Sequence, residues 1–513
     1  MSPLSRRAFL AVALSSTFLS SALLRARPAG ATAASGPFTH DTVVARARAL
    51  AREPYSERPS VPQDWLEISY EQYQKRWFRS RDALWADTDR SYNVDFFLPG
   101  LYFPRPVQIN TVTGGEVAAV AFDLSLFDQT DKAPELSAEG NLGYSGLRLR
   151  TDLSEPGQGE PGTKTEFCVF QGASYFRAIG KGQAYGLSAR GLALKTADPE
   201  GEEFPEFTEL WLEAPASGQR TMVVHALMDS PSATGAYRFS ITPGTSTVMD
   251  VEATLFAREE LTHAGLAPLT SMFLFDATNR HRFDDFRPGV HDSDGLLALN
   301  GNGEVIWRPL ANPKTLQVSS FVHENPRGFG LMQRARRLSE FNDLEADYHR
   351  RPSLWVEPQG DWGQGAVTLV EIPADKEIYD NIVAYWRPRD PYPAGAEVPL
   401  AYRLTWGEEP ILDLPRVTDT AQGAKIFGDP GRIVTVEFAA HPMFDGGPEA
   451  LDVHLHSPHV ALSDGVLQRN PETGGLRLAF NFDPAGRDHV ELRAQLRKDG
   501  NPASEVWLYR WTE

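Results

Sequence analysis

The sequence predicts an all-β protein, with a large antiparallel β-sandwich followed by a small immunoglobulin-like β-sandwich. Short segments with alternating apolar and polar residues recur over most of the chain after its first part. Turns rich in Gly and Pro separate these segments, and few stretches have the spacing of a helix. Because the chain has 513 residues, more than one apolar core is expected. Such a pattern is typical of stacked antiparallel sheets.

The first 33 residues are expected to be an export signal. Arg6 and Arg7 precede an apolar run that extends to Leu24. Two adjacent arginines before such a run are typical of a twin-arginine signal, and the small residues from Ala29 to Ala33 offer cleavage sites. We therefore predict export to the periplasm by the twin-arginine route and no membrane insertion after processing. An uncleaved N-terminal anchor is the alternative.

Residues 36–386 are expected to form the large sandwich. An amphipathic helix is predicted at Asp41–Glu53, before the strands begin. Strict alternation predicts strands at Leu147–Thr151 and Tyr237–Ile241. A second helix, charged on one side and apolar on the other, is predicted at Met332–Tyr348.

A linker is predicted at residues 387–399, where prolines cluster, and the small domain at residues 400–513. The regular spacing of short strands and turns in this second region is typical of an immunoglobulin-like sandwich, here without a disulfide. Its predicted strands are Tyr402–Trp406, Ile433–Phe438, Val453–His456, Leu476–Phe482, Val490–Leu496 and Val506–Trp511.

Composition excludes several classes of function. The formal net charge of -18 argues against binding nucleic acid through its phosphates and against docking on anionic lipid, but not against a neutral polymer. Cys168 is the single cysteine, so neither an internal disulfide nor a thiolate zinc cluster is expected. The chain contains neither a G-x-S-x-G elbow nor an H-E-x-x-H helix. No metal or other cofactor is expected.

Several sequence motifs are more specific to a protein family than the regular recurrence of short strands is. In order they are Gly172–Ala178, Tyr185–Gly191, Gly201–Pro205, Asp229–Ser232, Gly235–Phe239, Ala267–Phe273, Val290–Leu296, Asn325–Leu331, Arg351–Pro358 and Asp380–Trp386. With these motifs the chain resembles the periplasmic glucan biosynthesis protein G and D family over nearly all of the sequence after the signal. The twin-arginine signal favours the D branch, since the G type resembles a protein with an ordinary secretion signal.

The resemblance implies a large sandwich of the galactose mutarotase type followed by an immunoglobulin-like domain. It implies a role in shaping the β-1,2-linked glucose backbone of osmoregulated periplasmic glucans, with a β-1,2-glucan as the partner. Family members are classed as inverting glycoside hydrolases. A transglycosylase that closes β-1,2-glucan rings and a non-catalytic glucan-binding assembly factor are the alternatives. Homodimer contacts and other envelope glucan-synthesis proteins are candidate partners of the small domain.

Inverting cleavage of a glycosidic bond needs a protonated carboxyl for the leaving oxygen and a second carboxylate to activate the attacking hydroxyl. By resemblance, Asp380 matches the general acid of the family and Asp292 matches its general base, which acts through a chain of waters. Tyr348 matches a tyrosine linked to the reaction centre. Tyr379 and Ile382 are expected to shield Asp380 from water and so to keep it protonated.

The candidate sugar-binding residues are Trp355, Arg351, Asp294 and Tyr385. Structural roles remain open for some candidates. Asp292 and Asp294 also suit a capping turn, and Arg351 also suits an ion pair that orders an acidic loop.

Overall fold

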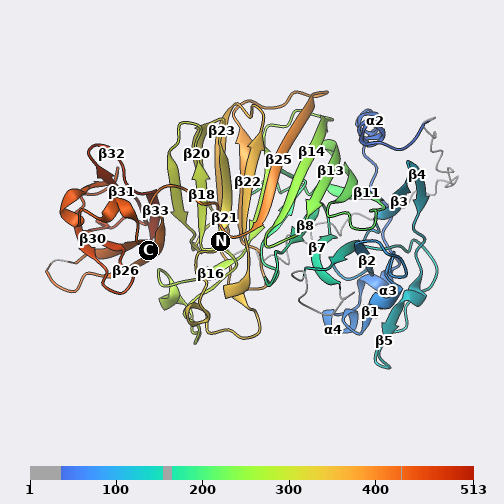
Figure 1. Ribbon diagram of the computed structural model, residues 1–513, viewed down its shortest axis with the longest axis horizontal. Coiled ribbons are helices and arrows are strands. Elements are labelled where there is room, and N and C mark those ends of the chain that lie inside the picture. The colour runs from blue at the N-terminus through green and yellow to red at the C-terminus, as the bar shows by residue number, and fades with distance from the viewer. Residues whose placement is uncertain (1–35, 154–163, 429) are drawn as a thin grey trace. The chain divides into compact units, whose positions relative to one another are not determined.

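The computed structural model describes residues 36–153, 164–428 and 430–513 (Figure 1). The signal expected at residues 1–33 lies outside these ranges. The described chain is built almost entirely of β-strands, which confirms the predicted all-β class. Within the described ranges, no helix has both the length and the apolar character needed to cross a membrane.

One layer of the large sandwich is a ten-stranded sheet in which all neighbours are antiparallel. In spatial order it contains β2 (Tyr92–Phe97), β6 (Gly146–Thr151), β7 (Thr165–Gln171), β8 (Tyr175–Ala178), β9 (Ser188–Arg190), β15 (Ala264–Ser271), β24 (Ile382–Pro388), β23 (Gln364–Glu371) and β20 (Gln317–Glu324), and β10 (Leu192–Leu194) also pairs with β15. The predicted strand at Leu147–Thr151 is confirmed as β6, where Leu147 and Leu149 are fully buried.

The other layer belongs to a fifteen-stranded sheet. In spatial order it contains β28 (Asp452–His456), β31 (His489–Lys498), β33 (Val506–Thr512), β19 (Val305–Pro309), β18 (Gly295–Leu299), β21 (Gly328–Met332), β22 (Ser353–Gln359), β25 (Glu397–Gly407), β14 (Thr247–Ala257), β13 (Ala233–Thr242), β12 (Met222–Asp229), β11 (Glu206–Glu213), β3 (Gln108–Thr113) and β4 (Glu116–Ala119), and β32 (Asn501–Pro502) pairs with β31. Figure 1 shows β25 between β14 and β22.

An apolar core fills the space between the two layers. Tyr237, Phe239 and Ile241 alternate along β13 and are fully buried, as their spacing predicts. Trp386 of β24 and Trp406 of β25 enter the same core from opposite layers. Because successive side chains in a strand point to opposite faces, the ten-stranded sheet has a second, outward face, which is available for polar side chains.

The helix predicted at Asp41–Glu53 is confirmed as α2 (His40–Leu50). Its buried residues Val43 and Ala47 pack with apolar side chains of β11 to β14. The remaining helices and strands of the large sandwich are short: α3 (Gln63–Leu66), α4 (Tyr70–Tyr73), β1 (Arg76–Phe78), β5 (Phe127–Gln129), β16 (Phe273–Phe275) and β17 (Val290–His291).

The prediction of a second helix at Met332–Tyr348 is wrong. β21 extends to Met332, and the rest of this stretch forms a loop with two short 3-10 turns, η4 (Leu338–Glu340) and η5 (Tyr348–Arg350). Asn342 and Asp347 have φ values of 53° and 51°, in the left-handed region that an α-helix excludes. Two of the charged residues in this stretch, Arg334 and Asp343, form ion pairs with distant parts of the chain instead.

The prediction of an interdomain linker at residues 387–399 is also wrong. Residues 389–396 connect β24 to β25, and both strands belong to the large sandwich. The predicted strand Tyr402–Trp406 lies within β25, which pairs with β14 and β22. The strands of the small sandwich therefore begin after β25. The proline-rich segment 389–396 is a loop between two strands of the large sandwich. Proline lacks a backbone N–H, and the loss of that hydrogen-bond donor costs little in such a loop.

The small sandwich has two layers. A four-stranded sheet contains β26 (Val417–Ala424), β27 (Arg432–Phe438), β30 (Leu476–Phe482) and β29 (Val466–Arg469). It packs against β31 and β33 through an apolar cluster that includes Val434, Phe480 and Trp507. β33 pairs in parallel with β19 at Ile306 and Trp307, so the two sandwiches share one continuous sheet. The sequence did not predict this continuity.

Candidate functional site

The candidate acid and base are both anchored to one short segment, Ser271–Phe273, at the end of β15. The backbone N–H of Asp292 donates to the carbonyl oxygen of Met272 at 2.8 Å. Asn381, which follows Asp380, donates its backbone N–H to the carbonyl oxygen of Ser271 at 3.1 Å. Its buried side-chain amide accepts from the N–H of Phe273 at 2.8 Å and donates to the carbonyl of Phe273 at 2.9 Å. Asn381 thereby holds the segment of Asp380 beside that of Asp292.

Asp292 is a buried carboxylate with an arginine partner. Its side chain forms an ion pair with the guanidinium of Arg351. Burial raises the pKa of Asp292 to about 6; Arg351 opposes this shift, and the carboxylate of Asp380 adds to it. A group with this pKa is mainly ionised at neutral pH and suits a general base.

Tyr348 completes this cluster. Its side chain is buried, and the guanidinium carbon of Arg351 lies 4.3 Å from the centre of its ring. Burial raises the pKa of the Tyr348 hydroxyl, and the carboxylates of Glu377 and Asp292 add to the shift. The phenol therefore keeps its proton at neutral pH. Arg351 also donates to the carbonyl oxygen of Ala346 at 2.8 and 3.1 Å, which fixes the turn before Tyr348.

Asp380 is exposed, which corrects one expectation. Ile382 points into the apolar core of the large sandwich, so it does not shield the carboxyl of Asp380 as predicted. Burial raises the pKa of Tyr175 to about 12; Arg190 opposes this shift and the Asp380 carboxylate adds to it. Tyr175 and Arg190, on which the charge of Asp380 acts, lie opposite each other across β8 and β9.

The sequence analysis missed this neighbouring pair. Arg190 lies 4.7 Å from the ring centre of Tyr175 and 5.4 Å from that of Phe204. Its guanidinium donates to the hydroxyl of Thr270 at 2.9 Å and to the carboxylate of Glu202 at 2.6 Å. The ring of Phe204 is 46% exposed. Arg190 therefore joins two aromatic rings, a hydroxyl and a carboxylate in one cluster. The motifs named from the sequence contain every residue of this cluster.

Only one of the four candidate sugar-binding residues, Arg351, lies in the Asp292 cluster. Trp355 is buried over Gly328 in the apolar cluster shared with the small sandwich. Tyr385 is fully buried, and its hydroxyl forms a hydrogen bond of 2.7 Å with His263. The placement of Trp355 and Tyr385 is that of core residues, so they do not enter the proposal below.

Asp294 holds the backbone of the next loop. Its carboxylate accepts from the N–H groups of Arg334 and Ala335 at 2.8 and 2.9 Å. Burial raises the pKa of Asp294 to about 6, and these bonds and the charge of Arg334 oppose the shift. Asp294 therefore acts as a structural residue that lies two positions after the candidate base.

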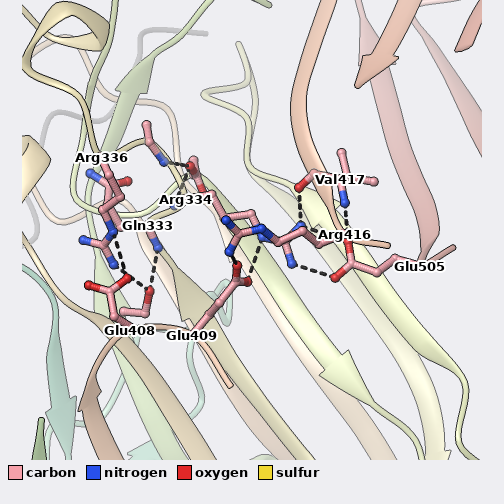
Figure 2. Close-up of polar contacts among 11 residues, drawn as sticks. Gln333, Arg334, Arg336, Glu408, Glu409, Arg416, Val417 and Glu505 are labelled. Carbon is pink, nitrogen blue, oxygen red and sulfur yellow. Dashed lines mark hydrogen bonds and ion pairs between the residues drawn. The ribbon is translucent and has the colours of Figure 1, made fainter. Parts of the chain in front are cut away.

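Arg334 connects this loop to the small sandwich. Figure 2 shows its guanidinium between Glu409 and Glu505. It donates to Glu409 at 2.9 Å and to the two oxygens of Glu505 at 2.6 and 2.9 Å, and it lies 3.5 Å from the ring centre of Trp307. Only 3% of its side chain is exposed. The small sandwich therefore contributes directly to the position of the segment that carries Asp292.

Within residues 36–153, 164–428 and 430–513, no group of three or more His, Cys, Asp or Glu side chains is placed to hold a metal ion.

Residues 38–511 match the family model described as periplasmic glucan biosynthesis protein, MdoG. The chain belongs to this family. It is 47% identical to glucans biosynthesis protein G of Shewanella sp. (strain W3-18-1), over 93% of this chain and 87% of the relative. It is equally identical, over the same shares, to glucans biosynthesis protein G 1 of Shewanella oneidensis. The protein of Shewanella baltica (strain OS195) is also 47% identical, over 93% of this chain and 88% of the relative.

Membership confirms the predicted G and D family and, at the level of the family description, a role in periplasmic glucan biosynthesis and a periplasmic location. These three relatives carry the name of protein G, so the assignment to the D branch stays a prediction, as does the twin-arginine route.

Proposed function

We propose that this MdoG family member cleaves β-1,2-glucan with inversion, with Asp380 as general acid and Asp292 as general base. The observation that supports this most is the pair of carboxylates anchored to Ser271–Phe273, one buried against Arg351 and the other exposed. Two carboxyl groups in different surroundings can take different roles. The roles themselves follow from the resemblance stated above.

In this proposal, a bound glucan covers the exposed Asp380 and displaces water from it. Asp380 donates its proton to the glycosidic oxygen while water attacks the anomeric carbon from the opposite face. The proton of that water passes, through further water, to Asp292. The protonated hydroxyl of Tyr348 and the guanidinium of Arg351 orient this path.

The proposal is tested by incubating the purified protein with linear β-1,2-glucan and resolving the products by mass. Shorter reducing chains with α-configured new ends are expected. Products lighter by one water would instead show that a sugar hydroxyl replaces water and closes a ring. Unchanged chains that remain bound would show a non-catalytic assembly factor and would contradict the enzymatic proposal.

The pH dependence distinguishes the two carboxylate roles. As a base, Asp292 must be ionised, so kcat/KM is expected to fall as the pH drops below about 6, where this carboxylate takes up a proton. Because the charge of Arg351 lowers the pKa of Asp292, the substitution R351M should move this acidic limb to higher pH. A pH–rate profile of both proteins checks this. An acidic limb that keeps its position in R351M would show that Asp292 is not the group that must be ionised.

The substitution Y348F should lower kcat by about tenfold or more with little change in KM, because it removes only a hydroxyl that orients the proton path. Steady-state kinetics on linear β-1,2-glucan measure this effect. Y70F, at a tyrosine that is 58% exposed, is the control and should match the unmodified protein. Equal turnover in Y348F and Y70F would remove Tyr348 from the mechanism.

A further inference from the structure

A buried glutamine, Gln333, joins two parts of the candidate reaction centre. It directly follows β21, and its side chain is 1% exposed. Its side-chain nitrogen donates to the backbone carbonyl oxygen of His291 at 2.9 Å and to that of Tyr348 at 3.2 Å. His291 is the residue before Asp292. A single side chain therefore connects the backbone beside the candidate base to the backbone of the candidate tyrosine.

The partners of Gln333 fix the orientation of its amide and the position of a proton on His291. Carbonyl oxygens only accept hydrogen bonds, so the amide group that faces both of them is the NH2 group, which has two hydrogens to donate. The side-chain oxygen of Gln333 then faces Nδ1 of His291 at 2.8 Å. Because this oxygen only accepts, Nδ1 carries a proton. Burial lowers the pKa of His291 to about 4, so the ring is neutral and its Nε2 has no proton.

Aromatic contacts hold the ring of His291 as well. It stacks on Phe273, with ring centres 5.5 Å apart, and its centre lies 4.9 Å from that of Phe341. Phe341 in turn stacks on Tyr348, with ring centres 5.7 Å apart. His291 is therefore connected to Tyr348 through the ring of Phe341 and through the amide of Gln333. The amide sets the geometry more strictly, because hydrogen bonds weaken steeply as their angle departs from linear.

The backbone of Gln333 is fixed independently of its side chain. Its N–H donates to the hydroxyl of buried Ser353 at 3.1 Å. On one side, the carbonyl oxygen of Met332 accepts from the N–H of Asp294 at 2.8 Å. On the other side, the N–H of Arg334 donates to the carboxylate of Asp294, also at 2.8 Å. A change of the Gln333 side chain therefore removes the bonds of the amide without releasing this backbone.

We infer that Gln333 is a positioning residue that keeps Tyr348 and Asp292 at the separation their shared proton path requires. The inference rests on the proposed function, in which water carries a proton to Asp292 and the Tyr348 hydroxyl orients that path. Each transfer needs heavy atoms about 2.6–3.2 Å apart. A displacement of about 1 Å can therefore cost about 100-fold in rate. A side chain that is 1% exposed does not contact the glucan, so binding should not change.

Steady-state kinetics of Q333M on linear β-1,2-glucan test the inference. Methionine keeps the length of the side chain but forms none of the three hydrogen bonds of the amide. We expect kcat to fall by about 10- to 100-fold with KM unchanged. The matched control is Q495M, at a glutamine of β31 that is 5% exposed, and it should keep kcat even if its melting temperature falls. An unchanged kcat in folded Q333M would overturn the inference.

Two further variants sharpen this test. Q333N keeps an amide but is one methylene shorter, so it does not reach both carbonyl oxygens. It should show the same loss of kcat, and it decides the test if Q333M does not fold. The double substitution Q333M/Y348F should lower kcat by clearly less than the product of the two single losses, because both changes act on one path. Losses that multiply fully would place Gln333 outside that path and would reject its positioning role.

A measurement without turnover separates the inference from the proposed function. The sheltered Nδ1 proton of His291 should give a downfield proton resonance that exchanges slowly with water, and its loss in H291Q assigns it. Q333M should shift or lose this resonance, and Q495M should keep it. These results without turnover in the unmodified protein would sustain the connection made by Gln333 and reject the enzyme. Normal turnover with a resonance that Q333M leaves unchanged would reject only the role of Gln333.

Discussion

D380N is expected to lower kcat on linear β-1,2-glucan by about 100- to 10,000-fold, the range that a general acid contributes. Asparagine has nearly the shape of aspartic acid but has no proton of comparable acidity to give to the leaving oxygen. Because Asp380 is exposed, the substitution should leave the melting temperature unchanged. Release of reducing ends measures the rate, and circular dichroism checks the fold.

Two comparisons sharpen this expectation. D375N changes an exposed aspartate in the same loop and should retain full activity. An aryl β-1,2-gluco-oligosaccharide, whose leaving group needs little help from an acid, should restore much of the rate of D380N. Equal loss on both substrates would mean that Asp380 binds the sugar rather than protonating the glycosidic oxygen. Full activity of D380N on glucan would remove it from the reaction.

R334M is expected to lower the free energy of unfolding by about 3–5 kcal/mol, the cost of leaving a buried charge without its partner. Glu505, with 2% of its side chain exposed, pairs with Arg334 through both oxygens. The guanidinium also covers the ring of Trp307, so methionine replaces its apolar contact but not its charge. Urea unfolding, followed by tryptophan fluorescence, measures the change.

R337M is the matched control. Arg337 is 79% exposed and pairs with nearby Glu340, so its loss should change stability by less than about 0.5 kcal/mol. The double substitution R334M/E505L should recover part of the loss, because it removes both buried charges together. A loss below about 1 kcal/mol in R334M would show that Glu505 is solvated and that this ion pair does not hold the two sandwiches together.

The strands were predictable where one face of each strand meets the core. Phe239 of β13 and Leu149 of β6 follow the period of two that burial on one face imposes. The same alternation located the strand Tyr402–Trp406 but assigned it to the small sandwich. The alternation of apolar and polar residues shows which side of a strand is buried, but it does not show which sheet the strand joins. The pairing of β25 with β14 depends on contacts between residues that lie far apart in the sequence.

The false helix at Met332–Tyr348 has a related cause. Its charged residues recur with a spacing that suits a helix, yet two of them pair with residues far away in the sequence. Arg334 binds Glu409 and Glu505, and Asp343 binds Arg287 at 2.7 Å. These ion pairs stabilise an irregular loop that local propensity does not favour.

The candidate acid, base and tyrosine came from the resemblance, since residue type alone does not distinguish one pair among 68 acidic residues. Trp355 and Tyr385 were chosen as sugar-binding aromatics, but an aromatic residue type does not tell which face of a strand it occupies, and both are buried. Asn381 was missed because a single amide beside an aspartate carries no sequence signal. Its importance follows only from its bonds to Phe273.

The most direct test of the account is the structure of the D380N protein with a linear β-1,2-glucan bound. The account predicts a glycosidic oxygen within hydrogen-bond distance of the side chain at position 380. It also predicts an ordered water, on the far side of that sugar, linked through hydrogen bonds to Asp292. A glucan that binds with no glycosidic oxygen near position 380, or with Asp292 sealed from its anomeric carbon, would contradict the proposed reaction.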